Sequence, residues 1–178
     1  MISRAISNIK KLQEFALEIG LSRAILAIAA PRMMLLEDHQ VEEDSAVFAR
    51  SVSEVEIIDV SRDLFASGHY SLSVQEAYKA VEKYVQFKSG KENLSGSSLM
   101  STIFSAANPV LSWTDRKTPS EQDEQKGYMY LYMGSMIGIR NPVVHEFGWV
   151  ESGGQALELI LFAQHLLRKA KEAKEAKL

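Results

Sequence analysis

The chain has 178 residues, of which 46% are hydrophobic and 24% are charged. This composition is that of a globular protein, and it excludes a disordered, collagen-like or low-complexity chain. The absence of cysteine excludes disulfide bonds and thiolate metal sites, and it favours a reducing cytoplasm as the compartment. Because 20 Lys and Arg oppose 23 Asp and Glu, for a net charge of −3, a wide basic surface for duplex nucleic acid is not expected.

The first half of the chain predicts amphipathic helices. Few prolines and no alternating β-branched runs favour an all-α fold. Apolar residues recur at three- and four-residue spacing in segments that predict helices over residues 3–19, 22–36, 45–66 and 71–88, with an acidic connector at 37–44. No segment has the length and apolar character of a membrane span or an export signal. We expect a helical extension over residues 1–60 and a helical bundle domain over residues 61–178.

The second half of the chain carries clearer helix boundaries. A short helix is expected over residues 95–107, and Thr118, Pro119 and Glu121 form the pattern of a capping box at the start of a helix over residues 119–139. The last helix is expected over residues 155–177, after a loop at residues 152–154 and ending in a solvated tail.

Three glycines interrupt the helix predicted over residues 119–139. Gly127, Gly134 and Gly138 each weaken the helix by roughly 1 kcal/mol relative to alanine. Close packing of another helix against these glycines would offset that cost. Pro142 then predicts that the helix kinks or ends, because proline lacks a backbone donor and disfavours helical geometry at Asn141.

One segment carries a motif with chemical meaning, Arg140-Asn141-Pro142-Val-Val-His145. It resembles the arginine-asparagine-(three residues)-histidine motif of the HEPN superfamily, whose members are helical nuclease-like domains of prokaryotic toxins and defence systems. A bare arginine–histidine pattern of this kind also occurs at Arg32 and at Arg62, but only Arg140 is followed by asparagine and proline. With further features in order from Leu64 to Tyr128, the chain resembles the Ymh-like family of hypothetical HEPN proteins over about residues 61–169.

The side chains of this motif suit RNA cleavage without a metal. Histidine titrates near neutrality, so it can remove the proton of a 2′-hydroxyl or protonate the leaving 5′-oxygen. Arginine holds its charge and binds phosphate oxygens with two N–H groups. One histidine and one arginine are too few for base, acid and charge stabilisation together, whereas a two-fold dimer brings two of each into one cleft.

The resemblance implies such a composite site at a homodimer interface. It implies that His145 is the general base and acid, that Arg140 stabilises the phosphorane, and that Asn141 orients His145 or contacts phosphate. HEPN sites often recruit a polar residue from an earlier helix, and Glu76, followed by Lys79, is the candidate here. The expected function is a cytoplasmic, metal-independent endoribonuclease without a cofactor, which acts on RNA as a toxin or antiphage effector under the control of an antitoxin or another regulatory protein.

Several alternatives remain open from the sequence. Arg140 could simply satisfy carbonyls at a helix end, and the whole chain could be a non-catalytic HEPN-like dimerisation or binding module, which its acidic net charge suits. The pairs Glu76 with Lys79 and Glu82 with Lys83 could be solvated helix faces. His165 is expected in the core or at an interface.

Overall fold

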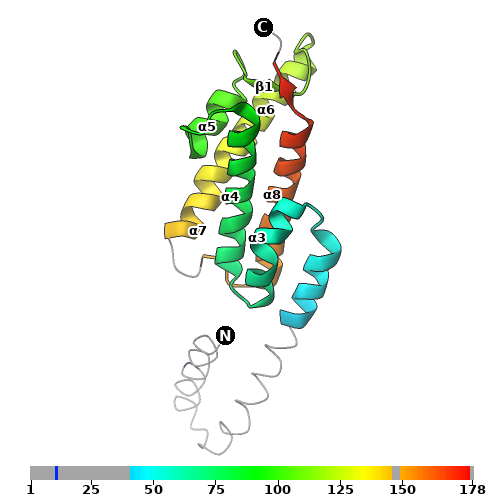
Figure 1. The fold of residues 1–178 in the computed structure, drawn as a ribbon, viewed down its shortest axis with the longest axis vertical. Helices are drawn as coiled ribbons and strands as arrows, with labels where there is room; N and C mark the ends of the chain where they lie inside the picture. The colour runs from blue at the N-terminus through cyan, green and yellow to red at the C-terminus, as the bar shows by residue number, and fades with distance from the viewer. Residues whose placement is uncertain (1–10, 12–40, 146–148, 177–178) are drawn as a thin grey trace, which may run out of the picture.

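The computed structural model describes residue 11, residues 41–145 and residues 149–176, with the side chains of residues 144 and 145 outside this description. Within these parts the chain is an all-α bundle, which confirms the predicted fold class (Figure 1). Residues 41–51 are helical, and the labelled elements are α3 (Val55–Ala66), α4 (Tyr70–Ser89), α5 (Gly96–Ile103), β1 (Leu111–Ser112), α6 (Pro119–Ser135), the π-helix η1 (Met136–Arg140), α7 (Asn141–His145), α8 (Gly153–Glu172) and β2 (Lys174–Glu175). The helices predicted over residues 3–19 and 22–36 lie outside the described residues.

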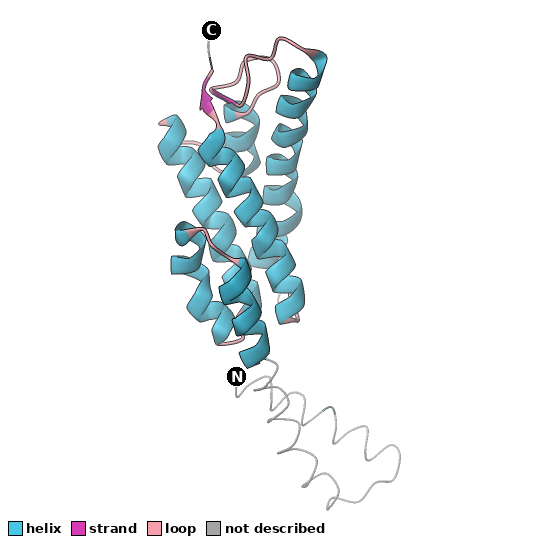
Figure 2. Ribbon diagram, turned by 90° about the vertical axis from the view of Figure 1, so that its right-hand side faces the viewer, coloured by secondary structure: helices cyan, strands magenta, loops and turns pink. Residues whose placement is uncertain are grey.

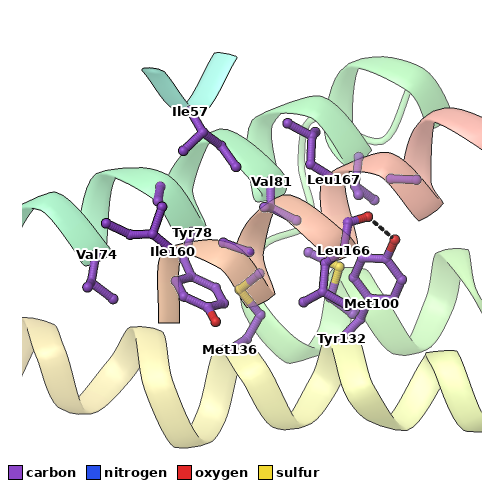
Figure 3. Packing of buried hydrophobic residues seen from close by; sticks show 14 of the residues in the cluster. Ile57, Val74, Tyr78, Val81, Met100, Tyr132, Met136, Ile160, Leu166 and Leu167 are labelled. Carbon is purple, nitrogen blue, oxygen red and sulfur yellow. Dashed lines mark hydrogen bonds between the residues drawn. The ribbon is translucent and has the colours of Figure 1, made fainter. Parts of the chain in front are cut away.

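Helix α4 occupies the middle of the bundle and packs against α3, α5, η1, α7 and α8. Its buried stripe includes Val74, Tyr78 and Val81, which meet α8 and the helix of α6 and η1 in the core (Figure 3). The hydroxyls of two buried tyrosines donate to α8 carbonyls: Tyr78 to Leu159 over 3.1 Å and Tyr132 to Leu166 over 2.6 Å. Burial raises the pKa of both phenols, so both hydroxyls keep the protons that these hydrogen bonds need.

Local signals placed several helix ends correctly. Helix α4 lies within one residue of the range predicted at each end, and Gly90 after it takes the left-handed conformation, with φ of 65°. The capping box before α6 is present: Thr118 accepts from the Glu121 backbone N–H, and the Glu121 carboxylate accepts from the Thr118 N–H over 3.0 Å. These boundaries follow from neighbours along the chain alone.

The single helix predicted over residues 45–66 is wrong, because the chain breaks at residues 52–54. The side chain of Gln164 on α8 stabilises the break. Its amide oxygen accepts from the backbone N–H groups of Ser53 and Glu54, over 2.7 and 3.2 Å, and its amide nitrogen donates to the Ser51 carbonyl. Hydrogen bonds from Lys171 and then Arg168 hold the pKa of Glu54 below its usual value, which shows that the ionised form is favoured there.

The C-terminal ends of α5 and α8 also differ from the prediction. Helix α5 stops at Ile103, short of residue 107. Helix α8 stops at Glu172, and residues after it pair as β2 with β1 in an antiparallel register, Leu111 opposite Glu175 (Figure 2). Lys174 and Glu175 are both exposed, as expected of a solvated tail. A two-residue pairing leaves no periodic trace in a sequence, so only the tertiary structure reveals it.

The predicted loop at residues 152–154 is instead the start of α8, where Ser152 caps the helix by accepting from the Gln155 N–H. A Cβ added to Gly153 would overlap the carboxylate of Asp44, whereas a Cβ added to Gly154 meets nothing within 4 Å among the described residues. The sequence did not predict the contact at Gly153, because Asp44 lies more than a hundred residues earlier, in the helix of residues 41–51.

Gly153→Ala is therefore expected to destabilise the protein by about 1–3 kcal/mol, since Asp44 must move to admit the methyl group. Gly154→Ala is the matched control and should be neutral or stabilising by less than about 1 kcal/mol. Urea unfolding followed by circular dichroism measures both. Equal effects of the two substitutions would show that the Gly153 contact carries no energetic weight.

Candidate functional site

The predicted motif lies where one long helix changes its winding. Helix α6 continues without a break through η1 into α7, and the Asn141 N–H donates to the Met136 carbonyl, five residues back. This wider turn accommodates Pro142, which has no N–H and whose ring collides with the carbonyl of residue 138 in a regular α-helix. The prediction that the helix kinks or ends at Pro142 is thus replaced by a π-turn just before it, and Arg140 is the last residue of that turn.

Arg140 is held by two polar groups. Its Nη2 donates to Oε2 of Glu82 over 3.3 Å, and its Nη1 donates to Oδ1 of Asn141 over 3.1 Å. The Nε atom is buried and has no hydrogen-bond partner among the described residues. The side chain as a whole is 28% exposed, so Arg140 is held from inside the bundle and remains partly open to solvent.

Glu82 is the residue that sequence reasoning missed. It was expected on a solvated face with Lys83, but its side chain is only 6% exposed. Its second oxygen, Oε1, accepts from the backbone N–H of Gly96, the first residue of α5, over 2.6 Å. One signal could have revealed it: Glu82 falls on the apolar stripe of α4, next to Val81 and four residues after Tyr78, where a carboxylate needs a partner.

The other predicted site residues lie in different settings. Glu76 and Lys79 form an ion pair with each other over 2.6 Å, both partly exposed on α4, and neither contacts Arg140 in the described structure. Asn141 contacts Arg140 directly. His145 is the last residue of α7, and its side chain lies outside the described part of the structure. The structure therefore joins Arg140, Asn141 and Glu82 into one cluster.

A strip of exposed apolar side chains and glycines lies along α6 and η1 and ends just before Arg140. Its large side chains are 56%, 45% and 55% exposed for Tyr130, Leu131 and Ile137. A Cβ added to any of its glycines meets nothing within 4 Å among the described residues, so the expected packing against them is absent within this part of the chain. We call these residues the α6 strip: Gly127, Tyr130, Leu131, Gly134, Ile137 and Gly138.

A second polar and aromatic cluster lies where α6 faces α8. His165 is exposed, so of its two expected positions, core or interface, the core position is wrong. Its Nε2 lies 2.9 Å from the Tyr128 hydroxyl. Lys169 lies 4.7 Å from the centre of the Tyr128 ring and pairs with Glu124 over 3.0 Å. The Trp113 indole N–H donates to the Lys169 carbonyl over 2.7 Å. These contacts join α6, α8 and the loop before α6, so the cluster stabilises the bundle.

The described residues form neither a membrane span nor a metal cluster. None of the helices there combines the length and apolar character that a bilayer span requires. No three histidine, aspartate or glutamate side chains come together there in a way that would hold a metal ion.

A family model described as a protein of unknown function (Hypoth_ymh) matches residues 52–170, about two thirds of the chain. No curated protein matches the chain, and no solved structure matches it. The matched region starts before the expected residue 61 and includes α3, whose Ile57 lies in the core. The chain therefore belongs to the Hypoth_Ymh family, as the sequence pattern predicted.

Proposed function

We propose that this protein is a metal-independent endoribonuclease of HEPN type that acts as a homodimer in the cytoplasm. The observation that carries the proposal is the setting of Arg140: a guanidinium held by a buried carboxylate and an amide, at a π-turn five residues before His145. The partners of Arg140 in the described structure are side chains, not the terminal carbonyls that an arginine at a helix C-terminus can bind. Single π-turns inside α-helices are frequent at functional sites.

The chemistry needs only protein side chains. One His145 takes the proton of an RNA 2′-hydroxyl, the 2′-oxygen forms a bond to phosphorus, and the bond from phosphorus to the 5′-oxygen breaks. A second His145 protonates the leaving oxygen, and the products are a 2′,3′-cyclic phosphate and a 5′-hydroxyl. Arg140 offers N–H groups to the phosphorane as its negative charge develops.

The α6 strip supports the second copy that this chemistry requires. No residue from Gly127 to Ile139 is charged, so two copies of this surface can approach without like-charge repulsion. The three glycines permit close approach of two helices, and nothing within the described chain uses them. Because the strip leads directly to Arg140, a two-fold axis near its end would bring two such arginines toward each other.

We further propose that the nuclease serves as a toxin or antiphage effector and that an antitoxin or regulatory protein restrains it, as the HEPN resemblance implies. A second candidate function is a non-catalytic dimerisation module. The observation that favours it is the Glu82 carboxylate, which neutralises the charge of Arg140 and so weakens its attraction for phosphate.

Cleavage of RNA by the purified protein tests the proposal. In EDTA, wild type is expected to cut a fluorescently labelled single-stranded RNA and to leave 2′,3′-cyclic phosphate ends, while His145→Ala cuts at least about 100-fold more slowly. A Lys79→Ala variant, assayed in parallel, shows whether that predicted auxiliary residue takes part. Equal cleavage by wild type and His145→Ala would contradict the catalytic role of His145, and no cleavage by either at any protein concentration would favour the non-catalytic module.

A further inference from the structure

We infer that Glu82 is the positioning residue of Arg140, an inference that rests on the proposed function. Glu82 lies on α4, and its two carboxylate oxygens have different partners: Oε1 accepts from the Gly96 N–H over 2.6 Å, and Oε2 accepts from Arg140 Nη2 over 3.3 Å. The carboxylate thus connects three elements, α4, the start of α5 and the end of η1.

Burial makes this connection rigid. Glu82 is 5% exposed and lies on the buried stripe of the central helix, so its surroundings limit the movement of its carboxylate. An arginine side chain otherwise has many rotamers, and a group that has to meet developing charge works best when its orientation is set beforehand. Glu82 and Asn141 together restrict the guanidinium from two sides.

The bound guanidinium still has donors for a ligand. Arginine has five N–H groups. One on Nη2 is used by Glu82, one on Nη1 is used by Asn141, and the one on Nε is buried. One N–H on each Nη nitrogen remains, and such a pair suits two oxygens of one phosphate.

Glu82 uses both of its oxygens as acceptors, one for the Gly96 N–H and one for Arg140. A substitution that removes one acceptor can therefore separate the positioning of Arg140 from the capping of α5. Glutamine has one oxygen and one NH₂ group, so at position 82 it can accept from Gly96 and cap α5, but it then presents a donor to Arg140. Glu82→Gln should therefore preserve the start of α5 while releasing Arg140. A carboxylate that served only as a helix cap would lose nothing by this change.

The experiment compares wild type, Glu82→Gln and the matched control Glu158→Gln, which removes the same charge from the exposed face of α8. Glu82→Gln is expected to lower kcat for RNA cleavage by about 10- to 100-fold without raising KM, because a misplaced guanidinium harms the transition state more than substrate binding. Glu158→Gln should leave both constants unchanged. Thermal unfolding of each variant confirms that it is folded under the assay conditions.

The mobility of the Arg140 side chain can be measured independently of RNA cleavage. The order parameter of the Arg140 Nε–H bond, measured by NMR relaxation, is expected to be near the rigid value of about 0.85 in wild type and below about 0.6 in Glu82→Gln. An unchanged order parameter, or an unchanged kcat in an active enzyme, overturns the positioning role. Loss of order in Glu82→Gln with no cleavage by wild type would instead support the positioning role and reject the ribonuclease.

Discussion

Arg140→Ala is expected to reduce RNA cleavage by at least about 100-fold, the usual cost of removing a donor that stabilises charge in a transition state. The guanidinium is the cation that the described cluster presents, with one N–H on each Nη nitrogen left for phosphate oxygens. Arg140→Lys should restore little of this activity. A lysine ammonium lacks the planar fork, so it cannot hold Glu82 and Asn141 while it also binds two phosphate oxygens.

The same substitution should also destabilise the protein, and that effect has to be separated from catalysis. Removing Arg140 leaves the buried Glu82 carboxylate with the Gly96 N–H as its remaining partner, at a cost of about 1–3 kcal/mol. The double variant Glu82→Gln/Arg140→Met removes the unpaired charge, keeps an acceptor for Gly96 and replaces the aliphatic part of the arginine.

The double variant is therefore expected to unfold at nearly the same urea concentration as wild type and still to cleave no RNA. Unfolding by circular dichroism and cleavage in EDTA, measured on the same preparations, check both statements. If the double variant recovered cleavage together with stability, Arg140 would have only a structural role.

The sequence predicted those parts of the fold that depend on neighbours along the chain. The capping box at Thr118 and Glu121, and the left-handed Gly90 after α4, are determined by residues within one helical turn. The break at residues 52–54 depends on Gln164, more than a hundred residues away along the chain. Without Gln164, the backbone N–H groups of Ser53 and Glu54 would find their acceptors most simply within a continuous helix. Contacts of that range leave no local pattern, so the prediction of one long helix was reasonable and wrong.

The candidate site divides in the same way. The adjacency of Arg140 and Asn141 is visible in the sequence, and their hydrogen bond follows from it. The partner on α4 is 58 residues away from Arg140. The HEPN resemblance instead indicated Glu76, as the polar residue that such sites often recruit from an earlier helix. Glu76 and Glu82 lie on the same helix and point in different directions around its axis, Glu76 toward a partly exposed face and Glu82 toward the buried stripe. Only knowledge of which stripe faces the core distinguishes Glu82 from Glu76.

Ile137→Asp is expected to convert a wild-type dimer into a monomer at micromolar concentration, because it places two like charges in the middle of the apolar α6 strip. Cleavage should fall by at least about 100-fold at that concentration, since each cleft then has one arginine and one histidine. Val55→Asp is the matched control: Val55 is 58% exposed, close to the 55% of Ile137, but lies on α3. Sedimentation velocity measures the oligomeric state, and a dimer that persists in Ile137→Asp would exclude the strip as the interface.

Gly134→Ala makes a subtler and more specific test of the same surface. Its added methyl group meets nothing within the described chain, so the helix itself should gain up to about 1 kcal/mol of stability. If two α6 strips pack closely at this glycine, the same methyl group separates them and weakens the dimer by at least about tenfold. A monomer that becomes more stable while its dimer becomes weaker is a combination that only a close helix–helix contact at Gly134 explains. A gain in stability with unchanged dimer affinity would place the two-fold contact elsewhere, and the exposed Phe87 on α4 would be the next surface to test.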